Sequence, residues 1–374
     1  MININAVFKL YYEWWKNIDK FIFILILSMF LLGLFFSLVS TSIIASDKLD
    51  TNTYYFFIKH LVFTILAIFL LIGFSFLGKK KLYKLSKIFF VVTLFFLILV
   101  PFIGIEVKGS TRWLDLPFVP RFQPIELLKP FFIIMIASVL SLENYKNIYL
   151  KYFLSFLIIF PIIILLITQP DLGQTLLVIL IWFSLIFVSG INLIFFLSFF
   201  GLASIVLSYI ILFVPKFDYI QKRLFSFLDP NSGDKHQSEK ALEAISNGGF
   251  FGKGIGEGTL NSRIPEAHTD YIVSVISEEF GVLFIIILMI VFLFFVYQVF
   301  KKLYSEDNNL SKLILVGSMS IILLQALIHI GVNIRLFPTT GMTLPFISYG
   351  GSSIVSTSIL SGFILNLTKR RIYY

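Results

Sequence analysis

Residues 21–43 of the chain read FIFILILSMFLLGLFFSLVSTSI, a run without a single charged side chain. The hydrocarbon core of a bilayer is about 30 Å thick, so a helix needs about 20 apolar residues to cross it. The run meets that requirement, and it lacks a small-residue cleavage site, so we expect a retained first membrane span. The rest of the chain has the same character: 58% of its 374 residues are hydrophobic, 45 are Phe and only 14% are charged.

Similar apolar runs recur along the chain, and their number defines the predicted fold. The sequence predicts an all-α integral membrane protein in which residues 1–374 form a single polytopic membrane domain. A long loop, residues 215–270, separates spans seven and eight, and we expect it to be folded and functional. About ten transmembrane helices are expected, at residues 21–43, 56–78, 87–105, 126–142, 150–168, 172–190, 192–214, 279–300, 311–334 and 345–367.

The basic residues indicate the orientation of this bundle. They collect on alternate connections, and cytoplasmic loops of membrane proteins carry such an excess. Both termini should therefore be cytoplasmic, which requires an even number of spans, and the 215–270 loop should be extracytoplasmic. The same lysines account for the net charge of +9 without a nucleic-acid partner. The clusters are Lys9, Lys16 and Lys20; Lys79, Lys80, Lys81, Lys84 and Lys87; Lys146 and Lys151; Lys301, Lys302 and Lys312; and Lys369, Arg370 and Arg371.

A polar face marks the start of the eighth span, in HTDYIVSVISEEFG at residues 268–281. Asp270, Ser274, Ser277, Glu278 and Gly281 recur at helical spacing, which predicts one polar stripe on an otherwise apolar helix. Because ionisable groups are costly in lipid, such a stripe indicates a cavity. Asp270 then has two interpretations: a carboxylate that faces a cavity at the outer surface, or an acidic residue that stabilises a helix N-terminus through its dipole.

Charged residues also lie at the start of the fourth span, in QPIELLKP at residues 123–130. Glu126 and Lys129 are three residues apart and therefore share a helix face. A lysine in an apolar stretch needs a carboxylate partner or a route to the interface. Glu126 is the local candidate partner, and Asp270 and Asp171, which lies in the tight break QPDLGQT (169–175), are the distant ones.

Three further segments have features of a head-group site. Arg112 can contact phosphate oxygens in a bidentate manner, and Trp113 suits either a cavity or the aromatic belt of the membrane interface. The run GGFFGKGIGEGT (248–259) lacks the spacing of a Walker A loop and the context of a dinucleotide fingerprint. Its backbone N–H groups could still approach a pyrophosphate. The small residues of LPFISYGGSS (344–353) allow either close helix packing or a broken helix beside a cavity.

Together these segments resemble the SEDS family, which includes RodA, FtsW and SpoVE. The resemblance rests on stretches spread through the chain in the family's order. The 215–270 loop is most similar to the FtsW branch, especially in its Gly256-Glu257-Gly258-Thr259 segment. One departure is Ile125, where family members usually have Ser, and it puts a hydroxyl contact with substrate in doubt. The matching stretches are residues 109–129, 169–175, 223–229 (RLFSFLD), 247–281 and 344–353.

The resemblance implies a peptidoglycan glycosyltransferase that polymerises lipid II, a disaccharide-pentapeptide on undecaprenyl pyrophosphate, during septal cell-wall synthesis. The family's essential aspartate falls on Asp270, which would act as general base. Lys129 is expected close to Asp270, where it would keep the carboxylate ionised. The residues expected to bind substrate are Arg112, Trp113, Glu126, Lys129, Asp171, Arg223, Glu257, Glu266 and His268.

The resemblance also implies a setting for the reaction. Its expected partners are a class B penicillin-binding transpeptidase and other divisome proteins, in the cell inner membrane at the division septum. No dedicated metal-ligand cluster is evident, although Mg²⁺ or Mn²⁺ could help to neutralise the leaving pyrophosphate. A lipid II flippase and a non-catalytic divisome scaffold are the alternatives. The predicted charges lie at the outer edge of the bundle and not at its midplane, where transporter sites lie, and this favours polymerisation.

Overall fold

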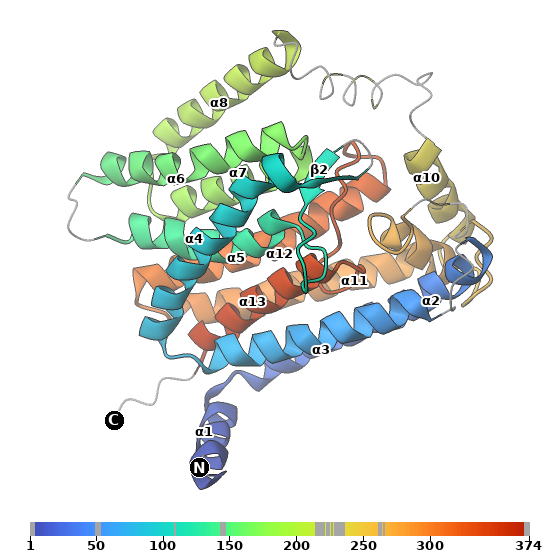
Figure 1. Ribbon diagram of the computed structural model, residues 1–374, viewed down its shortest axis with the longest axis horizontal. Coiled ribbons are helices and arrows are strands. Elements are labelled where there is room, and N and C mark those ends of the chain that lie inside the picture. The colour runs from blue at the N-terminus through green and yellow to red at the C-terminus, as the bar shows by residue number, and fades with distance from the viewer. Residues whose placement is uncertain are drawn as a thin grey trace.

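The computed structural model describes residues 4–48, 54–107, 110–142, 147–213, 221, 225, 227, 236–260, 264 and 266–369. These residues form a helical bundle with one small antiparallel hairpin, β1–β2, which the prediction of an all-α fold omitted (Figure 1). The elements are α1 (Ile4–Asn17), α2 (Lys20–Lys48), α3 (Tyr55–Phe76), α4 (Lys79–Ile103), β1 (Ile105–Val107), β2 (Ser110–Trp113), α5 (Pro124–Leu140), α6 (Ile148–Thr168), α7 (Leu172–Val188), α8 (Leu193–Phe213), α10 (His236–Gly248), α11 (Ile272–Tyr304), α12 (Asn309–Asn333) and α13 (Gly351–Leu367).

The protein is a multi-pass membrane protein. Six helices, α2, α3, α4, α6, α11 and α12, are each long and apolar enough to cross a bilayer, and α7, α8 and α13 contain shorter apolar stretches. Each of the ten predicted spans coincides with one helix, from α2 to α8 and from α11 to α13. Ten crossings and an extracytoplasmic 215–270 loop are predictions from the sequence.

Some helix ends differ from the predicted ones for local reasons. The third span was expected from residue 87, but α4 already begins at Lys79, since lysines are good helix formers that can extend into water. The last span was expected from residue 345, but α13 begins at Gly351. Pro345 begins a turn, residues 345–347, that precedes α13 in place of the expected helix.

The centre of the bundle consists of α5, α7, α12 and α13, whose side chains are mostly buried. Glycines allow these helices to approach their neighbours closely, as is usual where lipid supplies no hydrophobic driving force. A Cβ atom on Gly362 of α13 would lie 2.8 Å from Phe74 of α3, and one on Gly351 would lie 2.6 Å from Phe63. Figure 1 shows α13 beside α3, the pair that these glycines join.

Candidate active site

A cavity of about 1000 Å³ lies where several helix ends and connections converge. The N-terminal parts of α3, α5 and α13 contribute to its wall, together with β2 and two connections, residues 266–271 and 339–343. The predicted site residues that line it are Arg112, Trp113, Glu126, Glu266 and Asp270. Residues from stretches more than 200 positions apart in the sequence thus meet around one space.

Asp270 lies in the turn that precedes α11, and its partly buried side chain lines the cavity. Backbone contacts fix this turn: the N–H of Asp270 donates to the carbonyl of Glu266 at 3.1 Å, and Asn333 Nδ2 donates to the carbonyl of Asp270 at 3.0 Å. Asp270 therefore stands both at the start of a helix and in the wall of a cavity, so the two predicted settings coincide.

Gly341 keeps open the space between Asp270 and Arg112. A Cβ atom on Gly341 would lie 3.7 Å from Asp270 Oδ2 and 3.6 Å from Arg112 Nη1, so the two charged groups flank the same point. Gly341 also has a positive φ of 67°, which favours glycine. The carboxylate and the guanidinium therefore face a common space that a side chain at position 341 would occupy.

The predicted polar stripe is wrong beyond Asp270. Of its members Ser274, Ser277 and Glu278, none lines the cavity, and all three are buried. Ser274 Oγ instead donates to Asn333 Oδ1 at 2.8 Å. The helix begins only at Ile272, after Asp270, so the residues that follow turn into the packed interior between α10 and α12.

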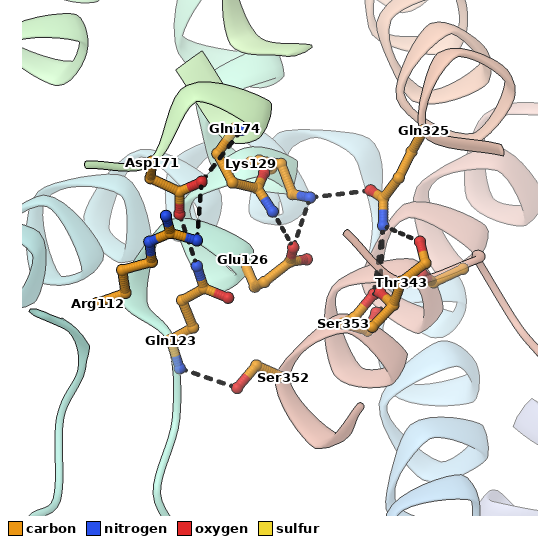
Figure 2. A network of polar contacts seen from close by, with 11 residues as sticks. Arg112, Gln123, Glu126, Lys129, Asp171, Gln174, Gln325, Thr343, Ser352 and Ser353 are labelled. Atoms are coloured by element: carbon orange, nitrogen blue, oxygen red, sulfur yellow. Dashed lines mark hydrogen bonds and ion pairs between the residues drawn. The ribbon is translucent and has the colours of Figure 1, made fainter. Parts of the chain in front are cut away.

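Arg112 connects the cavity to a buried carboxylate. Its Nη1 lies 3.7 Å from Asp171 Oδ1 (Figure 2). Its Nε donates to the carbonyl of Gln169 at 3.3 Å. Gln123 Nε2 donates to Asp171 Oδ2 at 3.0 Å, and the N–H of Gln174 donates to Oδ1 at 3.4 Å. Burial raises the pKa of Asp171, and the Arg112 guanidinium opposes that rise. Asp171 is therefore a support for Arg112 from behind the cavity wall, which it does not itself line.

Lys129 pairs locally, as one of the predicted alternatives proposed. Its Nζ donates to Glu126 Oε1 and to Gln325 Oε1, both at 2.9 Å, and its side chain is fully buried. Gln174 Nε2 donates to the same Glu126 oxygen at 2.5 Å. Lys129 does not line the cavity, and its expected closeness to Asp270 stays a prediction. Arg112 flanks Asp270 across Gly341.

Three polar residues of α12 connect these parts and were missed by the sequence analysis. Gln325, His329 and Asn333 are spaced by four residues and therefore share one face of the helix. Gln325 Nε2 donates to the carbonyl of Thr343 at 2.9 Å, and His329 Nδ1 lies 2.7 Å from the carbonyl of Met342. Asn333 holds Asp270 and Ser274. The spacing of polar residues within an apolar span was the signal that could have identified them.

The remaining predicted residues have different positions. The ring of His268 packs against Phe56 and Tyr349, with centroids 4.7 and 5.8 Å apart, next to the cavity wall. Glu257 is exposed and does not line the cavity, and Arg223 lies outside the described residues. Ile125, the departure from the family pattern, is fully buried. Among the described residues, no group of three or more His, Asp or Glu side chains is arranged to hold a metal ion.

Comparison with known proteins identifies the family. The FTSW_RODA_SPOVE family model, described as a cell cycle protein, matches residues 19–373. The chain belongs to this family. FtsW/RodA/SpoVE relatives include a protein of Wigglesworthia glossinidia brevipalpis, 32% identical with 95% of this chain and 96% of its own length covered, and one of Coxiella burnetii, 34% identical with 93% and 95% covered. Both are named probable peptidoglycan glycosyltransferase FtsW.

Solved structures of the FtsW/RodA/SpoVE family have the same fold. One chain, from a study of the structural coordination of polymerization and crosslinking by a peptidoglycan synthase complex, is 26% identical with a TM-score of 0.77, covering 94% of this chain and 97% of its own. The rod shape determining protein RodA of Thermus thermophilus is 25% identical with a TM-score of 0.68, covering 94% and 96%. The predicted family is therefore confirmed over nearly the whole chain.

Proposed function

We propose that this chain is a peptidoglycan glycosyltransferase of the FtsW type, which polymerises lipid II into glycan strands. The observation that carries the proposal is the pair of Asp270 and Arg112, which face one space across Gly341 in a cavity of about 1000 Å³. A membrane enzyme whose substrates keep their lipid anchors needs such a cavity within its bundle. The names of its relatives support the same activity.

Asp270 is the proposed general base. A sugar hydroxyl is a poor nucleophile, so a base must accept its proton as the new bond forms. In this mechanism the 4-hydroxyl of GlcNAc attacks C1 of the other sugar, its proton passes to Asp270, and the C1–O bond electrons leave with the lipid pyrophosphate. A single displacement of this kind converts an α-linked donor into a β-linked product without a covalent enzyme intermediate.

Cationic side chains of the cavity would stabilise the leaving pyrophosphate. Arg112 is already fixed by Gln169 and Asp171, so it is preorganised to meet an anion. Lys59 and Arg121 line the same cavity and were not predicted. A divalent cation such as Mg²⁺ would supply further charge neutralisation, and Glu266 and Asp270 are two carboxylates of the cavity lining that would help to hold it.

The cellular setting is proposed from the chain's charge pattern and its family. Lysines on alternate connections favour cytoplasmic termini in the cell inner membrane, and the similarity to FtsW proteins favours the division septum. A structural neighbour belongs to a complex that coordinates polymerization with crosslinking. We therefore expect a class B penicillin-binding transpeptidase as partner, together with other divisome proteins.

Purified protein, supplied with labelled lipid II and the partner transpeptidase, tests the proposal. A glycan ladder is expected from the wild type and from Asp307→Asn, a matched control in the connection between α11 and α12. No ladder is expected from Asp270→Asn or Asp270→Ala. A ladder from Asp270→Asn would overturn the role of the carboxylate as base. Transport of lipid II in liposomes without polymer would indicate the flippase instead, and neither activity would indicate a scaffold.

A further inference from the structure

The glycine-rich segment between α10 and α11 carries an unusual set of exposed side chains. Phe250, Phe251 and Ile255 are 75%, 84% and 62% exposed, although they lie within a few residues of one another. Clustered apolar side chains on a surface mark a contact with lipid or with another protein. The pyrophosphate interpretation of this segment does not explain them, and the N–H groups of Lys253 and Gly254 are already engaged by carbonyls of α11.

The depth of this segment in the membrane can be inferred from the part of α11 that it contacts. Phe280 and Phe284 of α11 pack against Phe36 of α2, with ring centroids 5.6 and 5.5 Å apart. At 1.5 Å per residue, Phe36 lies about 24 Å along α2 from Lys20, the basic residue at its start. The charge pattern predicts that Lys20 lies at the cytoplasmic interface. On that prediction, Phe36 and the part of α11 beside it lie within the outer portion of a hydrocarbon core about 30 Å thick.

The backbone of the glycine-rich segment lies at that same depth. Gly281 interrupts α11 with a φ of 81° and a ψ of 167°, and a Cβ atom on it would lie 2.2 Å from the carbonyl oxygen of Phe250. The N–H groups of Val282 and Leu283 donate to the carbonyls of Gly249 and Phe250 at 2.9 and 3.3 Å. The carbonyls of the segment thus take the place of the helical acceptors that Val282 and Leu283 lose at the break in α11.

The later residues of the segment are also hydrogen-bonded to the backbone of α11. The N–H groups of Lys253 and Gly254 donate to the carbonyls of Glu278 and Glu279, both at 3.0 Å. Irregular backbone occurs at membrane depth only where it is buried in protein or lines a water-filled cavity, and these hydrogen bonds hold the backbone of the segment against α11. The close approach also requires glycine, because a Cβ atom on Gly252 would lie 2.1 Å from the carbonyl oxygen of Glu279.

We propose that residues 249–255 form a membrane anchor, with Phe250, Phe251 and Ile255 inserted among the acyl chains of the outer leaflet. The surface is continuous with the lipid-facing side of α11, where Leu283 is 46% and Ile286 47% exposed. This continuity, at a depth within the hydrocarbon, selects acyl chains as the occupant. The anchor would hold α10, whose Gln237 lines the cavity, at a fixed height above the bilayer.

Single-cysteine labelling tests the anchor directly, because the chain has no native cysteine. Phe251→Cys and Ile255→Cys carry an environment-sensitive NBD fluorophore in vesicles of phosphatidylethanolamine and phosphatidylglycerol. Glu243→Cys on α10, whose native side chain is 52% exposed, is the aqueous control. Ile290→Cys, at a 57% exposed position of α11, is the lipid control. Iodide is present on both sides of the membrane, and nitroxide-labelled lipids are used in parallel.

At positions 251 and 255 we expect blue-shifted emission, iodide quenching several-fold weaker than at 243, and quenching by nitroxides on the acyl chains. Iodide quenching equal to that at 243 would overturn the proposal. So would protection that appears only after the transpeptidase is added, since the occupant would then be a protein. These outcomes do not depend on glycan synthesis, so the anchor and the proposed activity can fail separately.

Discussion

Asp270 and Glu278 lie eight positions apart on one predicted helix face, yet their surroundings are opposite. Asp270 precedes α11 and faces a cavity. Glu278 is fully buried, and its Oε1 accepts hydrogen bonds from Asn247 Nδ2, at 2.9 Å, and from the N–H groups of Thr259 and Leu260, both at 3.0 Å. Periodicity therefore identified two carboxylates that lipid would not tolerate, but only the tertiary fold decides which one lines a cavity and which one accepts hydrogen bonds in the packed interior.

The largest effects should come from removing each carboxylate in turn. Glu278→Leu leaves three donors, among them the buried N–H of Leu260, without their acceptor, and we expect a loss of about 3–5 kcal/mol in the free energy of unfolding. Asp270→Asn should change it by no more than about 0.5 kcal/mol while polymerisation is lost. Thermal unfolding in detergent and the glycan ladder measure the two quantities. Strong destabilisation by Asp270→Asn would remove the distinction between the two sites.

The glycines beside the two carboxylates extend the same contrast. Gly252→Ala forces a methyl group against the carbonyl of Glu279, 2.1 Å from the Cβ position, at a φ of 79°. We expect it to destabilise the protein by roughly 2 kcal/mol or more, because backbone cannot yield as a side chain can. Fluorescence-detected thermal unfolding would show this as a lowered midpoint. Gly256→Ala is the control, because a Cβ atom on Gly256 would meet no other atom within 4 Å.

Gly341→Ala should instead act mainly on catalysis. Its Cβ would be in ordinary contact with Arg112 and Asp270, so the cost is the strain of a φ of 67°, about 1–2 kcal/mol. The methyl group occupies the space that substrate needs, and we expect polymerisation to fall at least about tenfold, or 1.4 kcal/mol in the barrier. Initial rates of lipid II consumption check this. An unchanged rate would show that substrate does not enter between the two charges.

The helical spans and the local Glu126–Lys129 pair could be predicted because each depends on residues close in sequence. An apolar run of sufficient length has no alternative to a helix in lipid, and an i, i+3 spacing brings two side chains together. The resemblance to a known family then directed attention to Asp270, Arg112 and Trp113, all of which line the cavity.

The remaining features depend on contacts between distant segments. No proline marks the break in α11; Gly281 is held open by hydrogen bonds from residues 249–254, about 30 positions earlier. Gln325, His329 and Asn333 lie within a span that is apolar on average, so hydropathy conceals them. Their partners, Lys129, Met342 and Asp270, are in other parts of the chain, and no local rule connects them.

Asn333 offers a smaller perturbation, because it acts on Asp270 through the backbone. Asn333→Ala removes the donor to the carbonyl of Asp270 and the acceptor for Ser274. We expect kcat to fall about tenfold with KM little changed, since about 1.4 kcal/mol of positioning is lost. Asn333→Asp keeps the acceptor but turns a carboxylate oxygen toward the carbonyls of Asp270 and His329, so its rate should be no higher than that of Asn333→Ala. Ser318→Ala, at a buried position of α12 whose Oγ donates to the carbonyl of Ile314 in the same helix, is the control.

A pure packing defect would have a different signature from loss of positioning. If Asn333 only stabilised the bundle, Asn333→Ala and Ser318→Ala would lower the unfolding midpoint in proportion to burial, and rates of the folded fraction would match the wild type. Rates normalised to folded protein, taken across pH, separate the two cases. An unaltered normalised rate in Asn333→Ala would contradict the positioning role.

The smallest effect on stability should come from a third carboxylate, Asp19, near the other end of α11. Its ion pair with Lys302 is partly exposed to solvent. Asp19 Oδ2 lies 2.7 Å from Lys302 Nζ, and Oδ1 accepts from the N–H groups of Phe21 and Ile22. Because Asn also caps a helix, Asp19→Asn removes only the charge, at a cost of about 0.5–1 kcal/mol that high salt should reduce.

The pH dependence of that cost has a defined sign. Burial would raise the pKa of Asp19, but hydrogen bonds from Lys302 and from the N–H of Ile22 outweigh it and lower the pKa below its usual 3.8. The folded state therefore binds the proton less tightly than the unfolded state, so the charge stabilises the protein fully above 3.8. This advantage over Asp19→Asn should vanish as the pH falls through the folded pKa. If the stability difference between wild type and Asp19→Asn persists in acid, the negative charge of Asp19 is not its cause. Asp19 would then act as a hydrogen-bond acceptor, as Glu278 does for its three donors.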